Sequence, residues 1–494
     1  MAQRYRELAA LFPGEVLVTS SASSTQRGAL YVLDAAAASQ TPLLHWKGAA
    51  HVAQHGFDAT PSATHAKNDA GHSGWAVAVE ADKAVLNVYH WQKDQPAQRI
   101  VLPQKMTCIA LARRSALVAA GTDDGRLYVW DMRSGALVCS FEAHYRALRC
   151  LRFFDDDAAL VSASDDGRAC VWSTPGLARC TDLAGGRANV PTAYATLTDH
   201  TLPITDVHVA GRFPESAVVW TASADASVKL WDLRTRRLKS TFTLPGPVAA
   251  LAIDPLERFF FASLHGTAKA YRVELYTNDP GAWHARGGRG AEGASDTISA
   301  EHAHVLLAEP ITAMALTQAA SHIALGTQNG QVHIVDVTTL QVVRVLHASA
   351  SLAAAPNTPV TNILSMPRPP DLVGAAQLRA KKSRDETSPY VASLPARPVA
   401  QQFARTLGAP MDAPSVLVRI GDGAGTAARD VHTYLGAEAP AEAPHAAASA
   451  APRPAADPAH AARVQQLEDE LRRAKALNDE MWQHLVQANV AAHR

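Results

Sequence analysis

The sequence is poor in cysteine and has no long apolar run, which limits the classes of protein it can belong to. It holds five cysteines and no CxxC pair: Cys108, Cys139, Cys150, Cys170 and Cys180. This predicts reduced, buried thiols of an intracellular protein rather than a disulfide framework or a zinc site. No apolar run reaches the roughly 18 residues of a membrane helix, and the N-terminal MAQRYRELAALFPGEV has too short an apolar core for a signal peptide. We therefore expect a soluble cytosolic or nuclear protein without a membrane segment.

The sequence also carries no formal net charge, because Lys+Arg and Asp+Glu both number 46. No run of four basic residues occurs. Nucleic acid or acidic lipid would need a local patch to bind. A P-loop, a nucleophile elbow and an HExxH motif are absent as well, which argues against an enzyme built on these motifs. No cofactor is predicted.

What the sequence does contain is a repeat. DDGRLYVWD (123–131), DDGRACVWS (165–173) and ADASVKLWD (224–232) each place a tight turn before a strand that ends in Trp and a small polar residue. Weaker copies are RGALYVLD (27–34), DKAVLNVYH (82–90), HGTAKAYR (265–272) and NGQVHIVD (329–336). The Trp position is thus occupied by Leu33, Tyr89, Trp130, Trp172, Trp231, Tyr271 and Val335. Three of their spacings match the roughly 40–45 residues of one WD-repeat blade, and the longer ones indicate loop insertions.

Short apolar runs such as RFFFASL, separated by turn residues, predict strands. A four-stranded unit cannot bury both faces alone, so the seven units must stack around a channel. We expect an all-β fold, a seven-bladed WD-repeat β-propeller over residues 14–366 with a loop insertion at 277–306. The run PVTNILSMP (359–367) would complete a blade with the N-terminal strands and close the ring.

Histidine, serine and aspartate at short range could form a hydrolase triad, but here the pattern occurs twice, each time with a Trp at the same offset. The two sets are His144, Ser162, Asp166, Trp172 and His200, Thr221, Asp225, Trp231. A catalytic site has no reason to be duplicated one repeat later. We interpret both sets as structural tetrads, hydrogen-bonded chains inside one blade. Blade three has Asp124 and Trp130 but Ala120 at the Ser position, so its network should be incomplete.

Other candidate sites have plainer explanations. The paired aspartates of GTDDG (121–125) and ASDDG (163–167) lack the spacing and terminal Glu of a calcium loop and fit β-turns. HARGGRG (284–290) could touch RNA, but a solvated loop is favoured because it is a single copy beside acidic residues. The His-rich segment 56–72 lacks metal-ligand spacing and is interpreted as a connecting loop. No catalytic, metal-binding or cofactor-binding residue is predicted.

Several sequence segments resemble those of one particular family. Two of these segments are 115–153, which contains AHYRALRCL, and DHTLPITDVHV (199–209), and both have sequences that are unusual among propellers. The same resemblance is found in TASADASVKLWDL (221–233), STFTLPGPVAALAIDP (240–255) and GALYVLD…LLHWKG (28–48). They resemble the WD-repeat pre-rRNA-processing family, whose members belong to the Rix complex of large-ribosomal-subunit maturation. The departures are the insertion at 277–306 and the Ala/Pro-rich segment at 367–456.

The resemblance implies a non-catalytic scaffold of the nucleus, in nucleolus and nucleoplasm. Its implied partners are a helical-repeat Rix-type scaffold protein, an armadillo-like complex subunit, the pre-large-subunit particle and a midasin-type AAA ATPase. The implied process is removal of the internal transcribed spacer between the 5.8S and large rRNAs; some members are also implicated in assembling replication complexes on chromatin. The alternative is a WD-repeat substrate receptor for a ubiquitin ligase. Direct RNA contact stays open.

The sequence from residue 367 onward has a different composition. The Pro/Ala-rich segment 367–456 is poor in aromatics and predicts a disordered tether. AKKSR (380–384), with Lys381 and Lys382, is either part of a nuclear-import signal or a solvated basic cluster.

Residues 457–491 predict a helix, with Asp457 as N-cap and Pro458 at its first position. Its apolar positions follow a coiled-coil heptad in which Asn478 takes a polar a position. We expect a homodimer through Val464, Leu467, Leu471, Asn478, Met481 and Leu485. A helix bundle, a partner helix, or packing against its own propeller are the alternatives.

Overall fold

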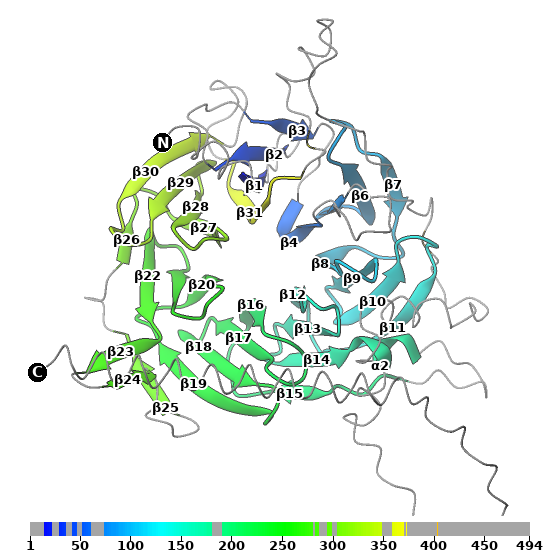
Figure 1. The fold of residues 1–494 in the computed structure, drawn as a ribbon. Helices are drawn as coiled ribbons and strands as arrows, with labels where there is room; N and C mark the ends of the chain where they lie inside the picture. Colours follow the sequence, from blue (N-terminus) through cyan, green and yellow to red (C-terminus); the bar gives the residue numbers. More distant parts are fainter. Residues whose placement is uncertain are drawn as a thin grey trace, which may run out of the picture. The chain divides into compact units, whose positions relative to one another are not determined.

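Seven blades, each built on four antiparallel strands, stand around a central channel in the computed structural model (Figure 1), which confirms the predicted seven-bladed propeller. The structure describes residues 14–21, 29–35, 42–46, 52–60, 74–179, 190–279, 282–285, 294–298, 304–347 and 358–369, together with Leu372 and Phe403. A second unit, residues 426–494, contains none of the described residues.

The blades are numbered here in chain order, and within each the strands run from the channel outward. Blades 2 to 4 are β4 (Val52–Ala59), β5 (Trp75–Glu80), β6 (Val85–His90), β7 (Gln98–Val101); β8 (Met106–Leu111), β9 (Leu117–Thr122), β10 (Arg126–Asp131), β11 (Leu137–Glu142); and β12 (Leu148–Phe153), β13 (Ala159–Ser164), β14 (Ala169–Ser173), β15 (Ala195–Leu197). Blades 5 to 7 are β16 (Ile204–Ala210), β17 (Val218–Ser223), β18 (Ser227–Asp232), β19 (Arg237–Thr243); β20 (Val248–Ile253), β21 (Phe259–Leu264), β22 (Lys269–Glu274), β26 (His304–Leu306); and β27 (Ile311–Leu316), β28 (His322–Thr327), β29 (Gln331–Asp336), β30 (Val342–His347).

Blade 1 closes the ring with both ends of the propeller sequence. Its innermost strand is β31 (Val360–Pro367), which pairs with β1 (Glu15–Ser21), followed outward by β2 (Ala29–Asp34) and β3 (Leu44–Trp46). Val18 faces Leu364 in this register. The predicted closing run is therefore confirmed, because β31 completes a four-stranded blade built from both ends of the propeller sequence.

The seven positions equivalent to the Trp all lie on the third strand of their blade, as the repeat predicts. Each apolar cluster spans two neighbouring blades, so the core is a series of blade-to-blade interfaces rather than one central mass. For example, Trp172 of β14 packs on Phe141 of β11, the outer strand of the preceding blade. Four cysteines of the described residues are buried with free thiols. Cys180 lies outside these residues.

A β-bulge recurs in the innermost strands of blades 3 to 7. The register shifts between Met106 and Cys108, and the same shift precedes Cys150, Asp206, Ala250 and Ala313. Bulges re-aim side chains where they occur. The residues that follow three of these bulges, Asp206, Ala250 and Ala313, line a common cavity at the channel.

The insertion at 277–306 differs from the predicted loop. It contains β24 (Ala282–Ala285), which pairs with β23 (Tyr276–Asp279), and β25 (Ala294–Thr297), which adds to the outer edge of β19 in parallel. Ile298 is buried in the cluster between blades 5 and 6, and β26 within this range is the outer strand of blade 6. The expectation of a loop over 277–306 is wrong for these strands, because an exposed sheet edge can recruit a further segment. Of HARGGRG (284–290), for which a solvated loop is expected, only His284 and Ala285 are described.

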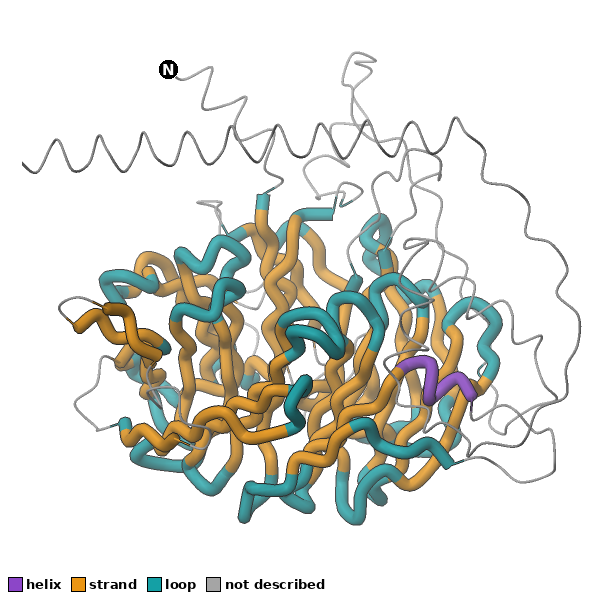
Figure 2. Tube along the Cα trace, turned by 60° about the horizontal axis from the view of Figure 1, so that its bottom comes forward, coloured by secondary structure: helices purple, strands orange, loops and turns teal. Residues whose placement is uncertain are grey.

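Figure 2 shows in purple the short helix that follows the third strand of blade 4. The helix α2 (Thr174–Ala178) follows β14, and its N-cap Ser173 accepts a hydrogen bond from Gly176 N at 3.2 Å. Among the residues that the structure describes, no helix is long and apolar enough to span a membrane. The His-rich segment begins in β4 rather than in a loop, since that strand continues to Ala59.

Candidate functional site

The four residues of the first tetrad lie together in blade 4. His144, in the loop before β12, has Nδ1 3.0 Å from Asp166 Oδ2 and Nε2 2.8 Å from Ser162 Oγ. Trp172 Nε1 donates to the same Ser162 Oγ at 2.9 Å. The chain therefore joins a loop, two strands and a turn of one blade.

The second tetrad has the same geometry in blade 5. His200 Nε2 lies 2.7 Å from Thr221 Oγ1 and Nδ1 lies 2.9 Å from Asp225 Oδ2. Trp231 Nε1 donates to Thr221 Oγ1 at 2.9 Å. Blade 3 has no hydroxyl at the matching position, Ala120, as the sequence indicates.

The hydrogen bonds of blade 4 define the protonation of its histidine. Ser162 Oγ accepts from Trp172 and donates to the Cys170 carbonyl at 3.4 Å, so Nε2 of His144 must donate to it. Nδ1 faces a carboxylate and donates as well. Burial opposes the charged form, but the Asp166 carboxylate and the Cys170 sulfur beside the ring outweigh it and raise the pKa of His144 to about 9.

This arrangement has the connectivity of a hydrolase triad but not its accessibility. Ser162 is 0% exposed, and its oxygen is already shared between His144 and Trp172. A nucleophile must reach a substrate carbonyl, which Ser162 cannot do here. The geometry fits a structural role for the tetrads.

Above the first tetrad, the loop between β11 and β12 presents a surface aromatic. The Tyr145 side chain is 84% exposed, and its backbone N–H donates to Asp166 Oδ2 at 3.3 Å. The Arg168 guanidinium lies 5.4 Å from the centre of its ring, within cation–π distance. The two residues border a cavity of about 290 Å³ that His144 and Trp172 also line. Tetrad and surface are thus coupled, since Asp166 bonds to both the His144 ring and the Tyr145 backbone.

A second polar cluster lies at the channel, where His55, Cys150 and Asp206 meet from blades 2, 4 and 5. His55 has a positive φ of 58° within irregular strand β4, and its backbone N–H donates to Asn362 Oδ1 at 2.6 Å. Its Nδ1 lies 3.7 Å from Cys150 Sγ, and its Nε2 lies 3.2 Å from the Thr205 carbonyl.

These three residues are the ones that could hold a metal, since their ligand atoms lie within 4.8 Å of one another. However, both Asp206 oxygens already accept backbone N–H groups, from Val207 and Leu251, each at 2.8 Å. The Arg152 guanidinium also lies beside Cys150 and supplies positive charge. Burial opposes protonation of His55, yet Cys150 and Asp206 raise its pKa to about 9. We therefore assign the cluster as a polar link between blades.

Sequence reasoning missed this cluster and the Tyr145 surface. One signal existed: Cys108, Cys150 and Asp206 occupy the same position after the bulge in successive blades, so aligning the inner strands would have brought them together. His55 carries no such signal. The predicted dimerisation residues, the HARGGRG segment beyond Ala285 and Lys381–Lys382 lie outside the described residues.

Comparison with known proteins agrees with the repeat. The family model of the WD domain, G-beta repeat, matches residues 100–131, 135–173 and 192–232. The chain is 32% identical to the Pre-rRNA-processing protein IPI3 of Mycosarcoma maydis, over 98% of each chain. It is 27% identical to the Pre-rRNA-processing protein crb3/ipi3 of Schizosaccharomyces pombe, over 52% of this chain and 61% of that one. WD repeat-containing protein 18 of Danio rerio is 30% identical over 38% of this chain and 42% of its own.

Proposed function

Because the chain belongs to the WD-repeat pre-rRNA-processing protein family, we propose that it is a non-catalytic scaffold of the Rix complex. The observation that carries the proposal is the similarity over nearly the full length to a relative named for pre-rRNA processing. That name supports a role in rRNA processing. A buried, hydrogen-bonded Ser162 fits a protein that binds rather than catalyses.

In this proposal the protein works in the nucleolus and nucleoplasm. It joins a helical-repeat Rix-type scaffold protein and an armadillo-like subunit on the pre-large-subunit particle. The complex aids removal of the internal transcribed spacer and engages the midasin-type AAA ATPase. A part in assembling replication complexes on chromatin is an extension of the same scaffold role.

The Tyr145–Arg168 surface is our candidate for one of the protein contacts. Tyr and Arg are enriched among the residues that dominate binding energy at interfaces. Tyr145 also lies in the phrase AHYRALRCL, which carries the family resemblance. Its loop is positioned by the tetrad beneath it, so a partner would meet a rigid anchor rather than a loose loop.

Affinity purification of the tagged full-length protein from nuclear extract tests the function. Recovery of Rix-type subunits together with pre-large-subunit rRNA is the expected result. Recovery of cullin components without rRNA would overturn it and favour the ubiquitin-ligase receptor.

Two exposed hydrophobic residues provide a matched pair of variants for the surface. Tyr145→Ala should reduce recovery of a protein partner without changing the melting temperature. Leu256→Ala is the control, since Leu256 is 72% exposed in the turn between β20 and β21, on the opposite face of the ring. Equal recovery with both variants would remove Tyr145 from the interface while leaving the proposed function standing.

A further inference from the structure

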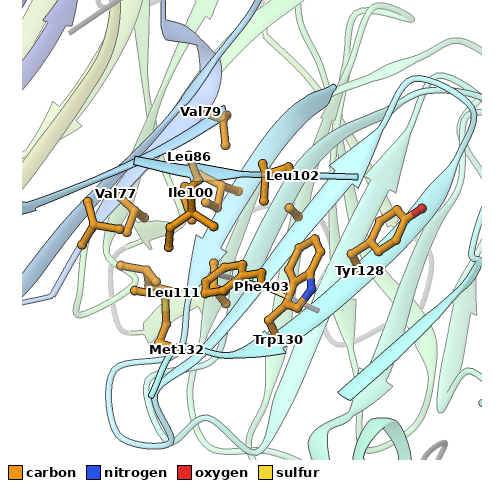
Figure 3. Close-up of a cluster of buried hydrophobic side chains, with 14 of the residues drawn as sticks. Val77, Val79, Leu86, Ile100, Leu102, Leu111, Tyr128, Trp130, Met132 and Phe403 are labelled. Carbon is orange, nitrogen blue, oxygen red and sulfur yellow. The ribbon is translucent and has the colours of Figure 1, made fainter. Parts of the chain in front are cut away.

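Phe403 lies in the sequence well beyond β31, the closing strand, yet it belongs to the propeller core. Its side chain is 4% exposed and is part of the cluster between blades 2 and 3. Figure 3 shows the ring beside Trp130, with Leu111 and Met132 of blade 3 and Ile100 of blade 2 around it. It is the only phenylalanine in the Pro/Ala-rich segment 367–456.

The ring extends an aromatic stack. The centres of Phe403 and Trp130 are 5.4 Å apart with planes 25° from parallel, and Tyr128 stacks on Trp130 at 5.2 Å and 5°. Aromatic pairs at such distances contribute beyond the area they bury. The contact is therefore specific in geometry as well as apolar.

The neighbouring blade boundary explains why this site accepts a ring. Trp172 of blade 4 packs on Phe141, which pairs with Leu127 in blade 3. At the equivalent register of blade 2, Leu86 pairs with Ile100, so the outer strand of blade 2 offers Trp130 an aliphatic side chain instead of a ring. Ala120, which replaces the tetrad hydroxyl, is small and belongs to the same apolar cluster. Phe403 supplies the ring that blade 2 does not.

We propose that the interface between blades 2 and 3 is a docking site for the protein's own C-terminal segment, with Phe403 as its anchor. Phe403 then fixes the C-terminal segment to blades 2 and 3. The site is an aromatic pocket that takes a short peptide in cis.

The test uses the full-length protein and a labelled peptide of residues 396–410. Phe403→Ala empties the pocket, so this variant should bind the peptide at least ~10-fold more tightly than wild type, whose own Phe403 competes at high effective concentration. The peptide carrying the same Phe403→Ala change should bind neither protein. A peptide of equal length centred on Tyr390 is the sequence control and should not bind.

A blocking variant sharpens the result. Ile100→Phe combined with Phe403→Ala fills the pocket with a ring from blade 2, in the way that Phe141 of blade 3 packs on Trp172 at the next interface. This double variant should bind the peptide no more tightly than wild type. Equal binding of the peptide to wild type and Phe403→Ala, or no binding to either, would overturn the proposal. If Phe403→Ala does not yield folded protein, Phe403→Leu is measured in the same way, with an intermediate gain in peptide binding expected.

Discussion

The hydroxyl of Thr221 accepts a hydrogen bond from the Trp231 indole, ten residues along the chain, at 2.9 Å. The same oxygen lies 2.7 Å from His200 Nε2. One buried atom thus holds the third strand of blade 5 to its second strand and to the loop that enters the blade. Blade 4 repeats the arrangement with Ser162, so the tetrads should act mainly on stability.

Removing one member of the blade 5 tetrad should destabilise the propeller. His200→Ala, Asp225→Ala and Thr221→Val should each lower the free energy of unfolding by about 1–3 kcal/mol, because buried partners lose hydrogen bonds. Thr201→Val, at an exposed neighbour, is the control and should change little. Denaturant unfolding of the purified protein measures the effect. A His200→Ala protein that melted like wild type yet failed completely in spacer processing would make His200 a functional residue instead.

The His144–Asp166 pair should make stability depend on pH. The pKa of His144 is raised from 6.5 to about 9, so its contribution is complete below pH 6.5 and is lost as the pH rises through 9. Burial opposes ionisation of Asp166, but the hydrogen bond from His144 lowers its pKa below 3.8, so that contribution is lost in acid. The stability difference between wild type and His144→Gln should therefore be largest between about pH 4 and 6.5 and shrink towards pH 9. His265→Gln, at an exposed histidine, is the control variant and should change the free energy of unfolding by less than about 0.5 kcal/mol at neutral pH.

Asp157 forms a clasp between blades 3 and 4, and its loss should be costly. Its Oδ1 accepts the backbone N–H of Arg113 at 2.9 Å, and its Oδ2 accepts those of Arg114 and Ser115, each at 2.6 Å. Asp157→Asn removes one accepting oxygen and the charge, which should cost about 1.5–3 kcal/mol. Asn tolerates the positive φ of 59° at this position, so backbone strain adds little.

Asp155 is the matched control for the clasp. Its side chain is 86% exposed and pairs with Arg113 at 3.2 Å on the surface. Asp155→Asn should change stability by less than about 1 kcal/mol. Thermal melts of both variants compare them, and equal melting temperatures would show that the clasp contributes nothing.

Sequence predicted those parts of the molecule that are local and repeated. Trp172 and Trp231 follow Asp-containing turns at a fixed distance, and that short pattern is enough to place the blades and to collect the tetrads. The closing strand was predictable because the run 359–367 follows the seventh copy of the repeat, while the first copy lacks an innermost strand of its own. None of these inferences needed contacts between distant segments beyond the repeat itself.

The parts that sequence did not predict depend on single tertiary contacts. The edge pairing of Ser240 with Ala294 has no periodic signal, because a lone parallel strand can be added by any extended segment. Phe403 is one aromatic in a polar, Pro/Ala-rich stretch, and composition alone assigns it to a tether. His55 reaches the channel through a backbone conformation with positive φ, which sequence usually signals by a glycine or an asparagine and here does not. Such features become visible only once the blades are in place.

The insertion should contribute to stability through Ile298. This side chain is 1% exposed and packs in the cluster between blades 5 and 6. Ile298→Ala should cost about 2–4 kcal/mol in the free energy of unfolding, since a buried aliphatic side chain is truncated. Leu306→Ala is the control, because Leu306 is 64% exposed in β26 of the same region. Removing residues 280–300 should destabilise the propeller for the same reason; wild-type melting of Ile298→Ala would show that the insertion is dispensable.

Residues 464–488, for which the heptad pattern predicts a helix, should make the protein a homodimer. From Val464 the apolar residues follow a heptad, and Asn478 stands at an a position, where a polar residue fixes the register of a parallel dimer at some cost in stability. Light scattering should give a dimer for the full chain and a monomer for a version that ends at residue 456. Leu471→Asp with Leu485→Asp should reproduce the truncation without changing the melting of the propeller, because charges at two a positions abolish the apolar seam. A monomer in both forms would place the helix against its own propeller or a partner, and a dimer in both would move the self-association to the propeller.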